Sequence, residues 1–208
     1  MGTPEAGQSA AAPSPANSAS PARRFVLALG TELAFGGEVQ EQRGSDLVNA
    51  SGYVLFGLNA SARYRVARPV ALGVRGSWAM DLGDRGYASS SAAKGSYDRS
   101  LGQLTVEGRY QPGDRRGWYA AIRAGVAIIV DSEGSYAAIQ GGPLGTVALG
   151  YDVSIVSALS LGLELQGNLA GFPENGVGYT AGEDGRSSTF VYGTSSWLGF
   201  GLVCSLGI

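Results

Sequence analysis

Charged side chains in this sequence recur at positions of the same parity inside stretches that are otherwise apolar. Within 117–131, for example, Arg123 and Asp131 share one parity, whereas Trp118 and Ile122 share the other. Because side chains of a β-strand alternate between two faces, these charges should gather on one face of a sheet. Opposite charges placed there could form a network of ion pairs or line a narrow path for ions.

The residue types that are scarce in this sequence exclude most enzymatic chemistry. The chain has no histidine, and Lys94 and Cys204 are its single lysine and single cysteine. Histidine-dependent acid–base catalysis, serine–histidine triads and zinc–histidine sites therefore have no residues to carry them. A lone cysteine cannot form an internal disulfide. We predict a non-enzymatic protein with no catalytic residue, no cofactor and no metal.

Two acid pairs, Asp131/Glu133 and Glu183/Asp184, are the remaining candidates for holding a divalent cation. Both pairs lie in or beside segments that we expect to be polar loops. Solvated loop carboxylates are the simpler interpretation, so we do not predict a metal site.

Composition indicates one folded domain. The chain has 208 residues and a net charge of −2, which gives no electrostatic case for binding nucleic acid. Residues 1–23 are rich in Pro, Ala and Ser and lack periodicity, which predicts a disordered N-terminal tail. They contain no apolar core of the kind an export signal needs. We assign the folded domain to residues 24–208.

Strand-like alternation of apolar and polar residues recurs along the whole of this domain. Most of the alternating stretches exceed the usual length of about 5–6 residues for globular strands and suit membrane-crossing strands, which need about 9–11. The eight stretches are 24–36, 52–66, 69–82, 99–110, 117–131, 143–156, 159–171 and 189–208.

The connections between these stretches alternate in length, as they do in up-and-down outer-membrane barrels. Short turns are expected around 67–68, 111–116 and 157–158, and long Gly- and Ser-rich loops at 37–51, 83–98, 132–142 and 172–188.

Charges within the strands all fall on one parity, which also holds many glycines and alanines. Small residues and paired charges suit the crowded interior of an eight-stranded barrel. The opposite parity is bulky and apolar, which suits contact with lipid. We predict an all-β, eight-stranded antiparallel up-and-down transmembrane β-barrel; a soluble, lipocalin-like ligand-binding barrel is the alternative. The predicted lumen charge network comprises Glu32, Arg63, Arg65, Arg75, Asp81, Glu107, Arg109, Arg123, Asp131, Asp152 and Glu164.

Aromatic residues on the apolar parity cluster near the strand ends, as expected for the two interfacial girdles of a membrane barrel. The predicted girdles are Phe25, Tyr64, Tyr110 and Trp118 at the short-turn end, and Phe35, Trp78 and Tyr192 at the long-loop end.

The topology and patterning of residues 24–208 resemble the small eight-stranded bacterial outer-membrane barrels, the group of the OmpA transmembrane domain and OmpX. In that family the last strand carries an assembly signal of alternating apolar residues ending in an aromatic. The present chain alternates in the same way but ends on Ile208. The apolar residues of its last strand are Leu198, Phe200, Leu202, Cys204, Leu206 and Ile208.

This resemblance implies an integral protein of the outer membrane of Gram-negative bacteria. Its expected partners are outer-membrane lipid and lipopolysaccharide, the barrel-insertion machinery through the C-terminal strand, and a surface or envelope protein. We expect a plugged polar lumen and a structural or surface-interaction role carried by the long extracellular loops. A narrow ion or small-solute channel is the competing function.

Overall fold

The computed structural model describes residues 24–43, 46–82, 98–113, 117–133, 136–172, 179–181 and 190–208; the predicted tail at 1–23 lies outside them. Each of the eight predicted stretches forms a β-strand, and a short ninth strand is added. The strands are β1 (Phe25–Arg43), β2 (Asp46–Arg65), β3 (Val70–Asp81), β4 (Asp98–Tyr110), β5 (Gly117–Glu133), β6 (Tyr136–Ser154), β7 (Leu159–Phe172), β8 (Tyr179–Ala181) and β9 (Phe190–Gly207).

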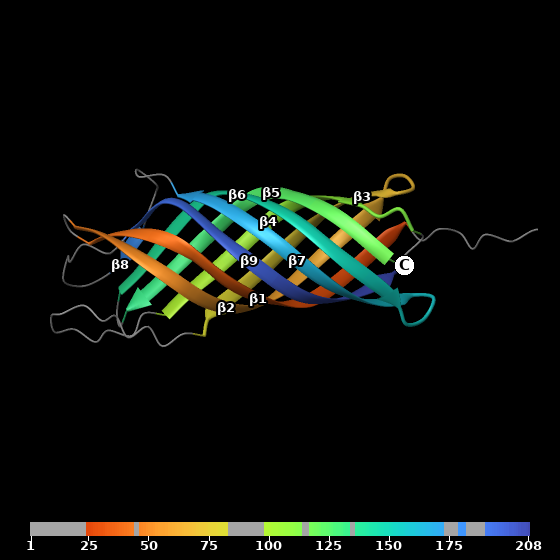
Figure 1. The fold of residues 1–208 in the computed structure, drawn as a ribbon, viewed down its shortest axis with the longest axis horizontal. Coiled ribbons are helices and arrows are strands. Elements are labelled where there is room, and N and C mark those ends of the chain that lie inside the picture. The colour runs from red at the N-terminus through yellow and green to blue at the C-terminus, as the bar shows by residue number, and fades with distance from the viewer. Residues whose placement is uncertain are drawn as a thin grey trace, which may run out of the picture.

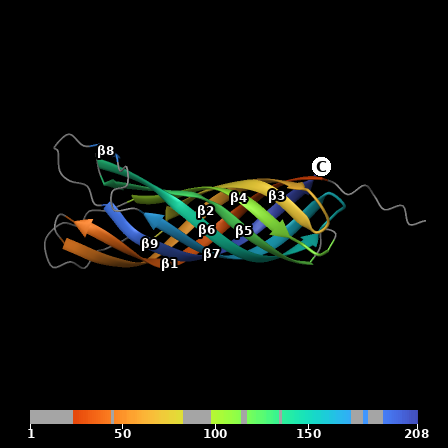
Figure 2. The same cartoon turned by 90° about the horizontal axis from the view of Figure 1, so that it is seen from above.

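Eight of these strands close into a barrel (Figures 1 and 2). Going around the ring, β1 to β7 follow in chain order, β9 pairs with β7, and β9 then pairs with β1. All pairings are antiparallel, and the three-residue β8 pairs with the extension of β6. Closure leaves no unpaired sheet edge around the barrel wall. The predicted eight-stranded antiparallel up-and-down barrel is confirmed. No helix within the described residues is long and apolar enough to cross a membrane.

The barrel has two different ends. The turns 66–69 and 155–158 lie at the end where the chain finishes, at the right of Figure 1, and we call it the turn end. The β1–β2 and β5–β6 hairpins extend to the opposite end, which we call the hairpin end.

Two of the predicted long loops are wrong. The β1–β2 ladder continues to the pair Arg43 and Asp46, and the β5–β6 ladder to Glu133 and Tyr136, so most of 37–51 and 132–142 is strand. An antiparallel ladder is held by backbone hydrogen bonds, so it can continue through segments of polar sequence. Most of the other two loops, 83–98 and 172–188, lies outside the described residues.

Exposure alternates along the strands, with the apolar residues outside. Leu29 and Ile122 are both 69% exposed, and Val147 is 65% exposed. The intervening residues are buried, as Tyr119, Ala121 and other inward residues of β5 show. Cys204 is exposed, in agreement with its parity. So broad an exposed apolar surface is unlike that of a soluble barrel.

The interior consists of two zones. The zone near the turn end is polar and charged, as predicted for the whole lumen. The zone near the hairpin end is dominated by apolar residues, with Arg99 and Gln140 as buried polar ones, which corrects that prediction. The reason is that inward residues of this zone pack on one another inside a narrow barrel, and apolar side chains do so without needing partners. This apolar layer comprises Ala34, Leu55, Ala79, Leu101, Ala127, Ile129, Leu144, Ala170, Phe172 and Trp197.

Candidate functional site: the charge network of the lumen

Strand register brings eight of the eleven predicted charges together inside the barrel. All eight are buried, and their four arginines balance four carboxylates. Ion pairs connect residues from strands that are far apart in sequence. We call this set the lumen network; its members are Glu32 of β1, Arg63 of β2, Arg75 of β3, Glu107 and Arg109 of β4, Arg123 of β5, Asp152 of β6 and Glu164 of β7.

Glu164 is the centre of the network. Its Oε1 accepts a hydrogen bond from Arg75 Nη1 at 2.9 Å. Its Oε2 accepts one from Arg123 Nη2 at 2.6 Å and one from the Tyr119 hydroxyl at 2.9 Å. β3 and β7 are four steps apart in either direction around the ring. The ion pair between Arg75 and Glu164 therefore spans the lumen.

A second layer of contacts connects Arg123 to further strands. Its Nε donates to Glu107 Oε2 at 2.6 Å, and its Nη1 donates to Gln166 Oε1 at 2.9 Å. Gln166 Nε2 also donates to Glu32 Oε1, and Glu32 Oε2 lies 3.5 Å from Arg75 Nη2. Arg123 thus pairs with an acid of the adjacent β4 and with Glu164 two strands away. Charge-assisted hydrogen bonds of this kind are about twice as strong as neutral ones.

Nearer the turn end, Arg109 and Asp152 form another ion pair, and Gln111 hydrogen-bonds to both. The Arg109 guanidinium carbon lies 3.4 Å from the centre of the Tyr119 ring, which is a cation–π contact. Arg63 Nη2 donates to Ser205 Oγ at 3.1 Å.

Three predicted members lie outside the lumen network. Arg65 and Asp81 are half-buried, at the turn-end terminus of β2 and the hairpin-end terminus of β3 respectively. The side chain of Asp131 is not among those described. Its Cα is in register with that of Arg99, a buried arginine that the sequence reasoning missed.

Other inward residues were also missed, although their parity could have revealed them. Tyr119 alternates with Ala121 and Arg123 along β5, and Trp197 alternates with Gly199 along β9. Both aromatics are 3% exposed. The prediction counted only charged residues on the inward parity, but an interior filled by side chains also accepts aromatic residues.

The predicted girdle residues with described side chains all face outward. Those at the turn end are joined by Tyr151, whose ring contacts Trp118 edge-on with centroids 5.2 Å apart. The side chain of Tyr192 is not described. The exposed girdle residues are Phe25, Tyr64, Tyr110 and Trp118 at the turn end, and Phe35 and Trp78 at the hairpin end.

Among the described residues, no group of three or more His, Cys, Asp or Glu side chains is arranged to hold a metal ion. The two acid pairs considered from the sequence have no described side chains. The buried carboxylates of the lumen network accept hydrogen bonds from arginines. These ion pairs and hydrogen bonds connect the strands of the barrel to one another.

A closed eight-stranded antiparallel barrel with an apolar outer face and a buried charge network has the fold of the small outer-membrane β-barrels. Neisserial surface protein A matches with a TM-score of 0.50 and 10% identity, over 88% of this chain and 97% of that chain. The outer membrane protein AlkL, solved in lipid bilayers, matches with a TM-score of 0.50 and 12% identity, over 100% of this chain and 97% of that chain. No protein-family model and no curated protein sequence matches. These neighbours share the predicted fold.

Proposed function

We propose that this chain is an integral, non-enzymatic outer-membrane protein with a closed lumen and a structural or surface-interaction role. The observation that carries the proposal is the Arg75–Glu164 ion pair, which crosses the lumen at 2.9 Å. Around it, the lumen network connects seven strands, and the apolar layer packs above it toward the hairpin end. Side chains fill the interior of an eight-stranded barrel, so little room remains for solute.

The outer face of the barrel supports membrane insertion. Residues halfway along the strands, such as Ile122 of β5 and Leu104 of β4, are more than 60% exposed. An arginine at mid-depth on such a face costs about 2–4 kcal/mol in a lipid bilayer, whereas an apolar side chain is stable there. The aromatic residues near both ends fit the two membrane–water interfaces.

The hairpin end supplies the surface for partners. The β1–β2 and β5–β6 hairpins continue the barrel wall toward this end, and they offer paired strands instead of the predicted loops. We expect this end to face the cell exterior, where it would meet lipopolysaccharide and a surface or envelope protein. The exposed alternating residues of β9 are the expected contact of the insertion machinery.

Two measurements test the proposal. Cell fractionation should place the protein in the outer-membrane detergent fraction, and the folded barrel should migrate faster on a gel before boiling than after it. In planar bilayers the purified protein should show no steady conductance. Release from cells without detergent would contradict membrane insertion, and a steady conductance would contradict the closed lumen and support the channel.

A matched pair of variants sharpens the bilayer measurement. Replacing both Arg75 and Glu164 with alanine removes the ion pair across the lumen and keeps the net charge unchanged. The double variant should conduct more than the wild type. The control is Leu165→Ala, which removes a side chain similar in size to that of Glu164 from the lipid-facing side of β7, where Leu165 is 54% exposed. That control should stay as silent as the wild type.

A further inference from the structure

The lumen holds a cavity at the turn end, on the far side of the lumen network from the apolar layer. Its volume is about 60 Å³. Because one water needs roughly 10–15 Å³ measured in this way, the cavity has room for several waters or one small ion. β-Strands from both sides of the barrel and the turn between β6 and β7 form its wall. The polar residues that matter here are Arg63, Arg65, Arg109, Asp152, Ser157 and Ser205.

The cavity carries an excess of positive charge. Three arginines and one carboxylate line it, which leaves a net charge of +2. The carboxylate belongs to Asp152, and it is already engaged by Arg109 and by Gln111. Arg65, which is outside the lumen network, lies half-buried in the lining of the cavity.

The charge of Arg63 is only weakly compensated. Only 7% of it is exposed, and its Nη2 donates to a neutral hydroxyl, that of Ser205. Its Nε has no hydrogen-bond partner, since the nearest carboxylate oxygen, Glu107 Oε1, is 3.9 Å away. The other oxygen of Glu107 is bound by Arg123. The one carboxylate that Arg63 pairs with is held at this long distance, and a buried guanidinium in so weak an ion pair can stabilise a bound anion.

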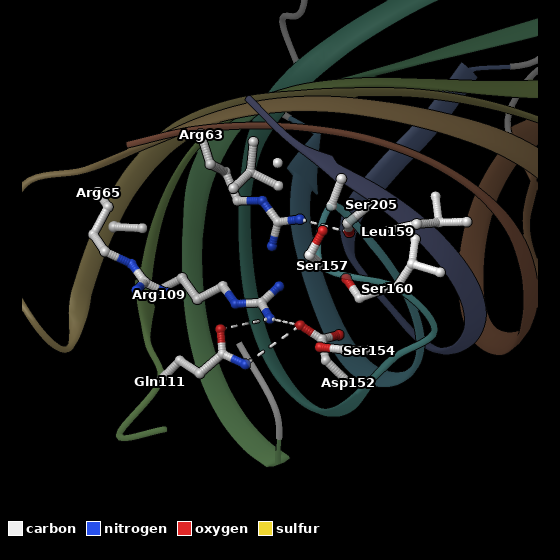
Figure 3. Close-up of a pocket in the computed structure, with 15 residues that line it drawn as sticks. Arg63, Arg65, Arg109, Gln111, Asp152, Ser154, Ser157, Leu159, Ser160 and Ser205 are labelled. Carbon is white, nitrogen blue, oxygen red and sulfur yellow. Dashed lines mark hydrogen bonds and ion pairs between the residues drawn. The ribbon is translucent and has the colours of Figure 1, made fainter. Parts of the chain in front are cut away.

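The donors around the cavity converge. Figure 3 shows the guanidinium groups of Arg63 and Arg109 turned toward the same space, with the hydroxyls of Ser157, Ser160 and Ser205 on its other side. Arg109 is paired with Asp152, and an anion in this space would also reduce the repulsion between the two guanidinium groups. Donors that approach from several directions match the oxygens of a tetrahedral oxyanion.

We propose that this cavity is a binding site for a phosphate-type oxyanion at the turn end of the barrel. The group is either free phosphate or the phosphate of a lipid headgroup. Arg63 and Arg109 supply the charge from inside the lumen, Arg65 attracts the anion at the mouth, and the serine hydroxyls complete the donor set. This site is independent of whether the lumen conducts.

The test is calorimetric titration of the folded barrel in a non-ionic detergent, with sodium chloride as the matched-ionic-strength blank. Inorganic phosphate is the first probe. Dihexanoylphosphatidylglycerol, below its micellar concentration, is the second. Saturable heat with phosphate alone supports a site for the free anion, and saturable heat with the lipid alone or with both supports a site that accepts a headgroup phosphate. Absence of saturable heat with both probes overturns the proposal.

Three variants show whether the heat comes from this cavity. Arg63→Gln should raise the dissociation constant of the bound probe at least tenfold. Arg65→Gln, at the half-exposed mouth, should raise this constant severalfold. This variant still tests the proposal if Arg63→Gln does not fold. Arg68→Gln removes a charge from the exposed turn next to the cavity without touching its lining, and should change the constant less than twofold. Equal effects of Arg65→Gln and Arg68→Gln would place the binding elsewhere and overturn the proposal.

Discussion

Glu164→Gln is the most direct test of the lumen network, because it removes a charge and leaves the size of the side chain unchanged. In the wild type, Glu164 accepts hydrogen bonds from Arg75, Arg123 and Tyr119 at 2.6–2.9 Å. The substitution leaves the four arginines of the lumen network with three carboxylates. Removing one partner of a buried ion pair costs about 3–5 kcal/mol. Since glutamine keeps one acceptor oxygen, we expect a loss of about 3 kcal/mol in the free energy of unfolding.

The assay is reversible urea unfolding in phospholipid vesicles, followed by tryptophan fluorescence. Arg75→Gln serves as the partner variant in a double-mutant cycle. The double variant restores equal numbers of buried positive and negative charges, so it should be less destabilised than the sum of the single variants by about 1–3 kcal/mol. Additivity to within about 0.5 kcal/mol would show that the two residues do not interact and would refute our description of the network.

Three further predictions test the faces of the wall. Ile122→Arg places a charge on the lipid face, at a cost of about 2–4 kcal/mol, and should reduce membrane assembly. Arg123→Ala should assemble normally but unfold at a lower temperature than the wild type. Gel migration with and without heating measures both effects. Gly125→Ala should destabilise the barrel, because a Cβ atom there would overlap a backbone carbonyl oxygen of β4; an unchanged urea midpoint would contradict this close approach. In single-tryptophan variants, lipids with brominated acyl chains should quench Trp118, which is 70% exposed, but not Trp197, which is 3% exposed; equal quenching would mean that the faces are wrongly assigned.

The sequence alone was enough to predict the fold class and the facing of the strand residues. Alternation is a local property: a residue such as Ile122 points away from Arg123 whichever strand is paired with β5. The residue types then indicate which face contacts lipid and which lies inside the barrel, because lipid excludes unpaired charges and a narrow interior accepts small residues and paired charges.

The extent of the hairpins was not predictable in the same way. The ladder between Gln42 and Leu47 requires only backbone hydrogen bonds, so it needs no apolar face. The amphipathic pattern therefore ends before the strand does. A polar strand of this kind has the composition of a loop.

The partners inside the lumen were decided by tertiary structure. Parity places Arg75 and Glu164 on the inner face, but they are 89 positions apart in sequence and four steps apart around the ring. Only the register of each ladder and the closure of β1 on β9 bring them within 2.9 Å. The same closure separates the apolar layer from the charged zone and leaves Arg63 beside a cavity. Alternation along the chain sets the side on which a residue lies, whereas the partner it meets there depends on long-range pairing that no local pattern contains.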